Sequence, residues 1–230
     1  MIVAMGGGGF SMEPWNTLLD DFIISLTGKE RPRVAFVPTA SGDSESYTLR
    51  FYQAFAGRGV PSHLELFRRS IADLHAFVLA QDVIYVGGGN TASLLAVWRA
   101  HGLDRVLREA HERGIVLAGP SAGGLCWFES GVTDSFGPGL ARLDGGLGIL
   151  PGSFCPHYDG EVERRPTYQR LVSEGLAPGH AADDGAALVF SGTVLREVVS
   201  SRAGALAYRV ERAGRDVVET PLPVRFLGGA

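Results

Sequence analysis

The sequence predicts an α/β fold built on a doubly wound, mostly parallel sheet. Short apolar runs rich in β-branched residues recur along the chain, and each ends in glycine, proline or small polar residues. Segments with apolar residues at a spacing of three to four separate these runs. Strands that are apolar along their whole length are typical of a parallel sheet covered by helices on both faces. Their alternation with helical segments indicates doubly wound topology.

The predicted strands of this sheet lie in the first half of the chain. They are 1–5, 33–41, 62–67, 82–90 and 114–121, of which 62–67 is the weakest. Ligands of such sheets bind at the carboxyl ends of the strands. In this sequence, glycine-rich and small polar stretches follow the carboxyl ends of the predicted strands. We therefore expect the functional site at the edge of the sheet where these ends lie.

Helical periodicity fills the intervals between the strands. The predicted helices are 15–28, 44–59 and 91–114, and we expect the last to break near Gly102. A single α/β domain over 1–230 accommodates all these elements, because 230 residues are within the size range of one domain.

The last third of the chain has a different pattern. The segments 185–200 and 205–222 are expected to be antiparallel strands, with tight turns at Ser191-Gly192 and Ala213-Gly214. The segment 129–153 is rich in glycine and serine, and we expect it to be the longest loop. Such a loop could act as a mobile lid over the site.

Composition excludes several classes of partner. The net charge is −4, with 21 basic and 25 acidic side chains, and no basic run indicates nucleic-acid binding. No apolar stretch is long enough for a membrane span, and the first residues do not form a signal peptide. Two cysteines do not make a disulfide framework, so we expect a cytoplasmic protein. Either a monomer or a homodimer is compatible with the sequence.

The sequence "GIVLAGPSAGGLCWF" at 114–128 predicts a strand, a sharp turn and a helix around Ser121. In a nucleophile elbow the serine has a strained backbone, and glycines two residues before and after it relieve the crowding. Gly119 and Gly123 occupy those positions. A plain glycine turn is the alternative interpretation, since the chain contains 32 glycines.

Two further glycine-rich stretches follow predicted strands. "VGGGNT" at 86–91 lacks the lysine of a phosphate-binding P-loop and the third glycine of a dinucleotide fingerprint. Gly89 could instead supply an N–H to an oxyanion, or the glycines could serve close packing. "MGGGGF" at 5–10 also lacks the dinucleotide spacing, so we interpret it as a structural or substrate-adjacent loop.

A serine nucleophile requires a base and an acid that orients the base. His157, in "SFCPHYDGE", is the preferred base, with His180 in reserve. The candidate acids are Asp134, Asp159, Asp183 and Asp184. The sequence around these residues gives little reason to prefer one of them. No zinc-binding motif occurs, and we expect neither a metal nor a cofactor.

Four motifs taken together resemble those of the peptidase E family. They are "VPTAS", "VGGGNTASLL", "GPSAGG" and "CPHYDGE", and the resemblance extends from about Val34 to Val199. This family is the S51 group of serine peptidases, which includes aspartyl dipeptidase and cyanophycinase. The resemblance implies a flavodoxin-like fold similar to that of class I glutamine amidotransferases, here with an antiparallel C-terminal extension.

The resemblance also implies roles for individual residues. Ser121 would be the nucleophile, His157 the base and Asp184 the acid, where the family often has Glu; Asp134 is the second candidate for the acid. The oxyanion donors would be the backbone N–H groups of Gly89 and Ala122.

The chain departs from the family at the substrate site. Aspartyl dipeptidases hold the acidic side chain of the substrate with an arginine, and Thr167 lies near that position. Arg164, Arg165 and Arg170 flank Thr167. Asn90, Arg165, Thr167 and Arg170 are therefore the candidate substrate-binding residues. Strict selectivity for N-terminal Asp is in doubt, because threonine does not replace a bidentate arginine–carboxylate contact.

The sequence thus predicts a serine peptidase that acts through an acyl-enzyme, and the resemblance implies that its substrates are short peptides. An esterase or amidase with the same nucleophile elbow is the first alternative. A non-catalytic domain that binds a small ligand is the second.

Overall fold

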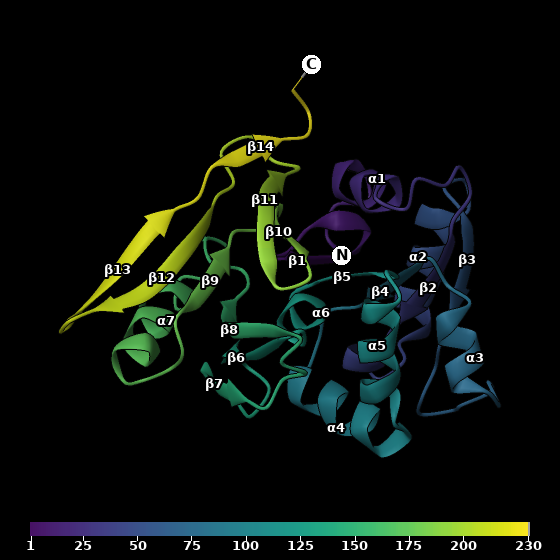
Figure 1. The fold of residues 1–230 in the computed structure, drawn as a ribbon, viewed down its shortest axis with the longest axis horizontal. Helices are drawn as coiled ribbons and strands as arrows, with labels where there is room; N and C mark the ends of the chain where they lie inside the picture. The colour runs from purple at the N-terminus through teal and green to yellow at the C-terminus, as the bar shows by residue number, and fades with distance from the viewer. Residues whose placement is uncertain (230) are drawn as a thin grey trace.

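A computed structural model describes residues 1–229, whose largest sheet has eight strands in the order β14-β11-β10-β1-β5-β4-β2-β3 (Figure 1). The five neighbouring strands from β1 to β3 in this order run parallel, as predicted. These strands are β1 (Ile2–Met5), β2 (Arg33–Val37), β3 (Val60–His63), β4 (Val83–Val86) and β5 (Val116–Pro120). Their carboxyl ends therefore meet at one edge of the sheet.

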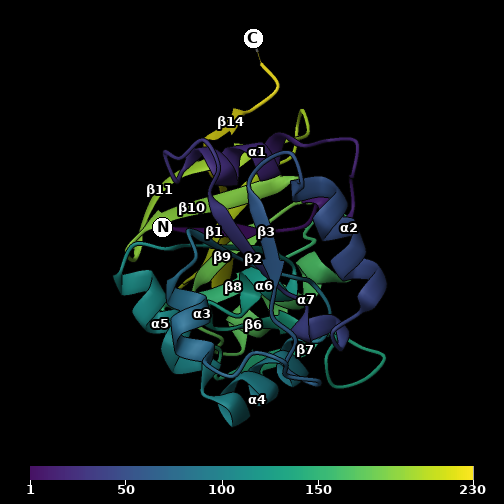
Figure 2. The same cartoon turned by 90° about the vertical axis from the view of Figure 1, so that its right-hand side faces the viewer.

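Helices cover both faces of this sheet, and Figure 2 shows α2 and α3 on opposite sides of β2 and β3. Val34 and Phe36 pack into a buried cluster with α1 and α2, whereas Ala35 and Val37 pack into another with α3, α4 and α5. This alternation explains why the strands are apolar throughout. The helices are α1 (Leu18–Ser25), α2 (Glu45–Phe55), α3 (Leu74–Leu79), α4 (Thr91–His101) and α5 (Leu103–Glu112).

The helix boundaries largely follow the sequence pattern. Gly102 separates α4 from α5, as predicted, and adopts a left-handed φ of 72° that glycine tolerates at a helix end. Helix α3 is not among the predicted helices, because its six residues show little periodicity.

A second sheet of six strands, in the order β13-β12-β9-β8-β6-β7, adjoins the first (Figure 1). Its strands are β6 (Phe128–Thr133), β7 (Ala141–Asp144), β8 (Leu150–Cys155), β9 (Gly179–Ala182), β12 (Ala207–Ala213) and β13 (Asp216–Pro221). Helix α7 (Arg164–Ser173) packs against it through Tyr168, Leu171 and Val172.

The prediction of a long loop at 129–153 was wrong, because β6, β7 and the start of β8 occupy most of that segment. Gly131 in β6 is of a residue type common in loops, but here the packing of neighbouring strands requires glycine. A β-carbon there would lie 2.1 Å from the carbonyl oxygen of Phe154 in the neighbouring strand. Gly131 therefore reflects close approach of strands, and 134–140 and 145–149 form the connections that remain.

The C-terminal strands form two hairpins, with turns where the sequence predicts them. Strand β10 (Ala186–Ser191) pairs antiparallel with β1 and extends the large sheet. Strand β11 (Val194–Ser200) pairs antiparallel with β10, and β14 (Val224–Phe226) pairs parallel with β11 at the edge. Strands β12 and β13 instead belong to the second sheet and form a hairpin at its end (Figure 1).

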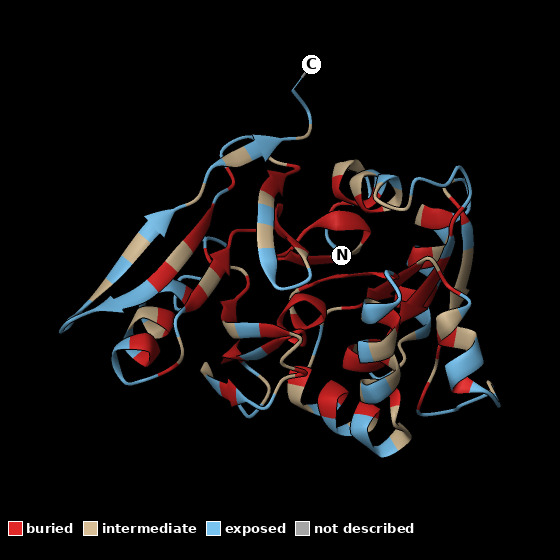
Figure 3. Ribbon diagram, in the orientation of Figure 1, coloured by how far each residue is buried: buried red, intermediate tan, exposed pale blue. Residues whose placement is uncertain are grey.

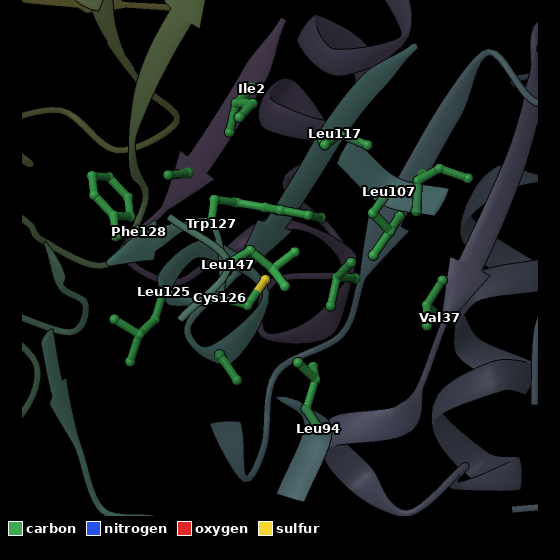
Figure 4. Close-up of a cluster of buried hydrophobic side chains, with 14 of the residues drawn as sticks. Ile2, Val37, Leu94, Leu107, Leu117, Leu125, Cys126, Trp127, Phe128 and Leu147 are labelled. Carbon is green, nitrogen blue, oxygen red and sulfur yellow. The ribbon is translucent and has the colours of Figure 1, made fainter. Parts of the chain in front are cut away.

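The two sheets share one buried core (Figure 3). Ile2 of the large sheet belongs to the same cluster as Phe128 and Phe154, whose rings stack 5.0 Å apart in the second sheet. Trp127 and Cys126 lie in the same cluster (Figure 4). None of the helices in residues 1–229 is long and apolar enough to cross a bilayer.

Candidate active site

Ser121 lies in a sharp turn between β5 and the short helix α6 (Ala122–Leu125). Its backbone has φ 55° and ψ −118°, which is rare for a residue with a side chain. The flanking glycines make this turn possible. A β-carbon on Gly119 or Gly123 would lie 2.2 Å from the carbonyl oxygen of Val86. This arrangement has the geometry of a nucleophile elbow.

The glycine loop after β4 passes directly beside this serine. A β-carbon on Gly88 would lie 3.4 Å from Ser121 Cβ and 3.9 Å from Ser121 Oγ. The Gly88 N–H donates to the hydroxyl of Tyr47, at 3.2 Å. Within residues 1–229, the Gly89 and Ala122 N–H groups donate to no other group. The two predicted oxyanion donors are therefore free to bind a developing negative charge.

Asn90 links this loop to the segment that follows β6. Its Oδ1 accepts from the Ser93 N–H at 2.8 Å, which caps α4, and its Nδ2 donates to the Ser135 carbonyl at 3.0 Å. The Ala92 N–H also donates to Ser135 Oγ, at 3.2 Å. Both polar atoms of the Asn90 side chain are thus bonded within the protein.

His157 and Asp184 meet at the carboxyl end of the sheet, although 26 residues lie between them in the sequence. His157 Nδ1 donates to Asp184 Oδ1 at 2.6 Å, and both side chains are largely buried. His157 has a left-handed φ of 54°. Because Nδ1 carries the shared proton, Nε2 is the nitrogen left to accept a proton.

Two neighbours hold the Asp184 backbone in place. The Asp184 N–H donates to Asp159 Oδ1 at 2.8 Å, and Gly7 forms a parallel β-bridge with Asp184. A β-carbon on Gly7 would lie 2.0 Å from Asp184 Oδ1 and 3.0 Å from His157 Cε1. The "MGGGGF" loop is therefore glycine-rich where it passes against this pair.

Burial alone would raise the pKa of Asp184. The hydrogen bond from His157 and the positive charges of His157, Arg202 and Arg164 outweigh this effect, so the pKa of Asp184 is lowered from its usual value. Asp184 is consequently an ionised acceptor at neutral pH, which is the state that orients a histidine base.

The other candidate acids and the reserve base lie in different surroundings. Asp134 is exposed and forms no hydrogen bond with His157 within the described residues. Asp183 accepts from the Leu206 N–H at 2.9 Å, and burial raises its pKa to about 6. His180 packs against Phe190 with ring centroids 5.8 Å apart, and burial lowers its pKa to about 4.

The basic residues of α7 are all engaged with acidic partners. Arg165 pairs with Glu219, and Arg170 pairs with Glu174 at 2.7 Å. Arg164 is buried and donates to Glu161 at 2.7 Å and to the Val132 carbonyl at 3.1 Å. Thr167 is half-buried on the same helix.

Sequence reasoning missed several residues that build the site. Tyr47 and Ser135 bond the glycine loop, and Gly7 allows close approach to Asp184. Asp159, which was predicted as a candidate acid, instead holds the Asp184 backbone. The run of glycines at 6–9 was a usable signal for close approach. Nothing local to Tyr47 or Ser135 indicates their partners, which lie more than 40 residues away in sequence.

Comparison with known proteins identifies the family of this chain. Residues 2–198 match the model described as "Peptidase family S51". The chain belongs to peptidase family S51. It is 58% identical over 229 residues to "Uncharacterized peptidase YgaJ" of Bacillus subtilis, covering 99% of each chain. It is 30% identical to "Peptidase E" of Pasteurella multocida, covering 80% of this chain and 79% of that protein.

Two solved peptidase structures have the same fold. A peptidase from an acI-B1 Actinobacterium superposes with a TM-score of 0.73 at 20% identity, covering 97% of this chain and 93% of the other. A putative peptidase E from Listeria monocytogenes gives a TM-score of 0.57 at 19% identity, covering 96% and 98%. The S51 chain thus has the flavodoxin-like fold of class I glutamine amidotransferases, and its family supports a peptidase function.

Proposed function

We propose that this S51 protein is a cytoplasmic serine peptidase that hydrolyses short peptides through an acyl-enzyme. The observation that carries the proposal is the strained turn that presents Ser121, with φ 55°, beside the free N–H groups of Gly89 and Ala122. Backbone strain of this kind is retained where a fold positions a nucleophile. The cytoplasmic location is supported by the two cysteines, which are both free and buried.

In the proposed mechanism, His157 Nε2 takes the proton of Ser121 as its Oγ attacks the scissile carbonyl. The negative oxygen of the tetrahedral intermediate accepts from the N–H groups of Gly89 and Ala122. His157 then donates the proton to the leaving amine, and water repeats the sequence on the acyl-enzyme. Asp184 keeps Nδ1 protonated and stabilises the imidazolium that forms.

Ser121 Oγ forms no hydrogen bond within residues 1–229 in this structure. Catalytic hydrogen bonds of serine hydrolases often form only when substrate is bound. We therefore propose that substrate binding completes the contact between Ser121 and His157.

The proposed substrate range is wider than N-terminal Asp. Arg165 and Arg170 are paired with Glu219 and Glu174, and Thr167 carries no charge. An acidic substrate side chain would thus find no unpaired arginine on α7 of this chain. Hydrolysis of an X-Leu dipeptide series, with X varied, tests this proposal. We expect several X residues to be accepted, and an exclusive preference for Asp would contradict it.

The nucleophile is tested by replacing Ser121 with Ala and measuring dipeptide hydrolysis beside a p-nitrophenyl ester panel. We expect the variant to lose at least about 10³-fold in kcat for peptides. An esterase would hydrolyse esters and no peptide, and a binding domain would keep its biological activity in Ser121→Ala. Ser93→Ala is a suitable control, because Ser93 takes part in α4 capping only through its backbone N–H.

A further inference from the structure

We propose that Tyr158 and Glu219 form a positioning pair, through which the C-terminal β12–β13 hairpin holds His157 and Asp184 in register. The inference rests on the peptidase function proposed above. Neither residue touches the reacting atoms, and both act through the neighbours of Tyr158.

Tyr158 lies between the two residues that organise the acid and base. His157 precedes it and donates to Asp184, while Asp159 follows it and accepts from the Asp184 N–H at 2.8 Å. The backbone of His157 and Tyr158 forms hydrogen bonds to two segments that flank the site. The His157 N–H donates to the Gly6 carbonyl at 3.3 Å, and the Tyr158 N–H donates to the Ala182 carbonyl at 3.1 Å. Fixing Tyr158 therefore fixes both partners of Asp184.

The Tyr158 side chain is anchored by one polar contact inside an aromatic cluster. It is 2% exposed, and its ring lies 6.2 Å from that of Tyr168 and 5.3 Å from that of Tyr208. Its hydroxyl donates to Glu219 Oε2. Burial and the Glu219 charge raise the pKa of Tyr158 well above its usual value, so the hydroxyl remains a donor.

Glu219 is held as firmly as the tyrosine it binds. Its carboxylate also accepts from Gln169 Nε2 at 3.0 Å and from Arg165, both on α7. The Arg165 guanidinium lies over the rings of Tyr158 and Tyr208, 5.4 Å and 5.1 Å from their centroids. A charge-assisted contact of this kind is stronger and more directional than a neutral hydrogen bond.

An anchor is needed here because the His157 backbone is strained. A left-handed φ of 54° persists only when the surroundings over-determine it. Loss of the anchor would let His157 relax and turn its imidazole away from Asp184. Glu219 lies beyond residues 2–198, which match the S51 model, so the pair is a contribution of the C-terminal hairpin to the site.

The test compares Tyr158→Phe, Glu219→Gln and the double variant with the unaltered enzyme, at a temperature where urea unfolding shows all of them folded. We expect each single variant to lower kcat for a dipeptide about tenfold or more with little change in KM, because a misplaced catalytic group costs rate rather than binding. The effects of the two changes on kcat should not add, because both weaken the same Tyr158–Glu219 contact. Glu211→Gln is the control. It removes a charge from the same hairpin, where Glu211 pairs, within residues 1–229, only with half-exposed Arg209, and should leave kcat unchanged.

A spectroscopic readout decides the inference independently of peptide cleavage. The proton that His157 Nδ1 shares with Asp184 is observed by NMR and assigned by its loss in Asp184→Asn. We expect this proton to exchange faster with water in Tyr158→Phe and Glu219→Gln, and at the unaltered rate in Glu211→Gln. If the two variants lose only stability, with kcat and exchange unchanged, or if their effects on kcat add, the inference is wrong. If Ser121→Ala cleaves like the unaltered enzyme, the proposed function fails and the exchange comparison alone decides this inference.

Discussion

At the residue scale, the site is defined by backbone conformations that few side chains adopt. Asp43, Ser121 and His157 are the non-glycine residues with positive φ among those described. Two of these three are the proposed nucleophile and base. Backbone strain often concentrates at functional sites. In the local sequence, the only sign of this strain is the glycines that flank the strained residues.

The charge of Asp184 is the feature of the pair that matters most for the proposed mechanism. Asp184→Asn keeps the size of the side chain but can donate to Nδ1, which favours the wrong histidine tautomer. By analogy with other serine peptidases, we expect kcat to fall by about 10⁴-fold. Steady-state hydrolysis of a dipeptide measures this loss.

Asp183→Asn serves as the matched control for this change. It removes a neighbouring charge but retains an acceptor for the Leu206 N–H, so we expect activity close to that of the unaltered enzyme. Equal activity of Asp184→Asn and Asp183→Asn would show that Asp184 does not orient His157.

At the element scale, the close approach of α6 to β4 depends on single glycines. The predicted strand, turn and helix around Ser121 are present, but α6 has only four residues and is held by packing. Cys126 follows it in the core, fully buried, where burial raises the pKa of the thiol far above its usual value. A thiol in that state is not a competing nucleophile.

We predict that Gly123→Ala lowers the free energy of unfolding by about 1–3 kcal/mol, because its methyl group would overlap the Val86 carbonyl. The variant should also lose activity, since relief of the overlap moves Ser121. Urea unfolding and dipeptide hydrolysis measure the two effects. Gly57→Ala is the control, because a β-carbon there meets nothing within 4 Å. An unchanged unfolding transition in Gly123→Ala would contradict the packing argument.

Several strands of the second sheet, among them β6, were not predicted from the sequence. In β6, Gly131 breaks the alternation of apolar residues because Phe154 of the adjacent strand leaves no room for a side chain. The helix α7 was also missed, since its interior includes Pro166 and several charged residues that obscure an apolar face.

At the scale of the whole molecule, buried acids make stability depend on pH. Asp20 is 2% exposed in the core beneath the glycine loop at 6–9, and burial raises its pKa to about 7. The nearby Tyr85 hydroxyl, Phe10 amide and Arg58 charge offset only part of this rise. In the unfolded chain, an aspartate titrates near about 3.9.

The folded protein therefore retains a proton that the unfolded chain releases between pH 4 and pH 7, approximately. We predict that the free energy of unfolding falls as the pH rises through this interval and levels off above it. Asp20→Asn should remove most of this dependence and stabilise the protein at pH 8 by up to about 4 kcal/mol. Asp183, with a pKa of about 6, accounts for a smaller remaining slope of the same sign.

Urea unfolding at pH 5, 6.5 and 8 measures the slope in the unaltered protein and in Asp20→Asn. Asp21→Asn is the control, because Asp21 is half-exposed and pairs with Arg58 at 2.6 Å. If Asp20→Asn and Asp21→Asn retain the same slope as the unaltered protein, another group controls the pH dependence.

The sequence by itself determined the parallel sheet, most of its helices, the C-terminal hairpins and the turn at Ser121. These depend on periodicity and on glycine spacing, which are local properties of a chain. The residues themselves favoured His157 as the base, and motif resemblance selected Asp184 among the candidate acids. Only the tertiary structure decided that Asp184 bonds His157 while Asp134 does not, and that Glu219 reaches Tyr158. Such contacts join residues far apart in sequence, and only the packing of complete elements brings them together.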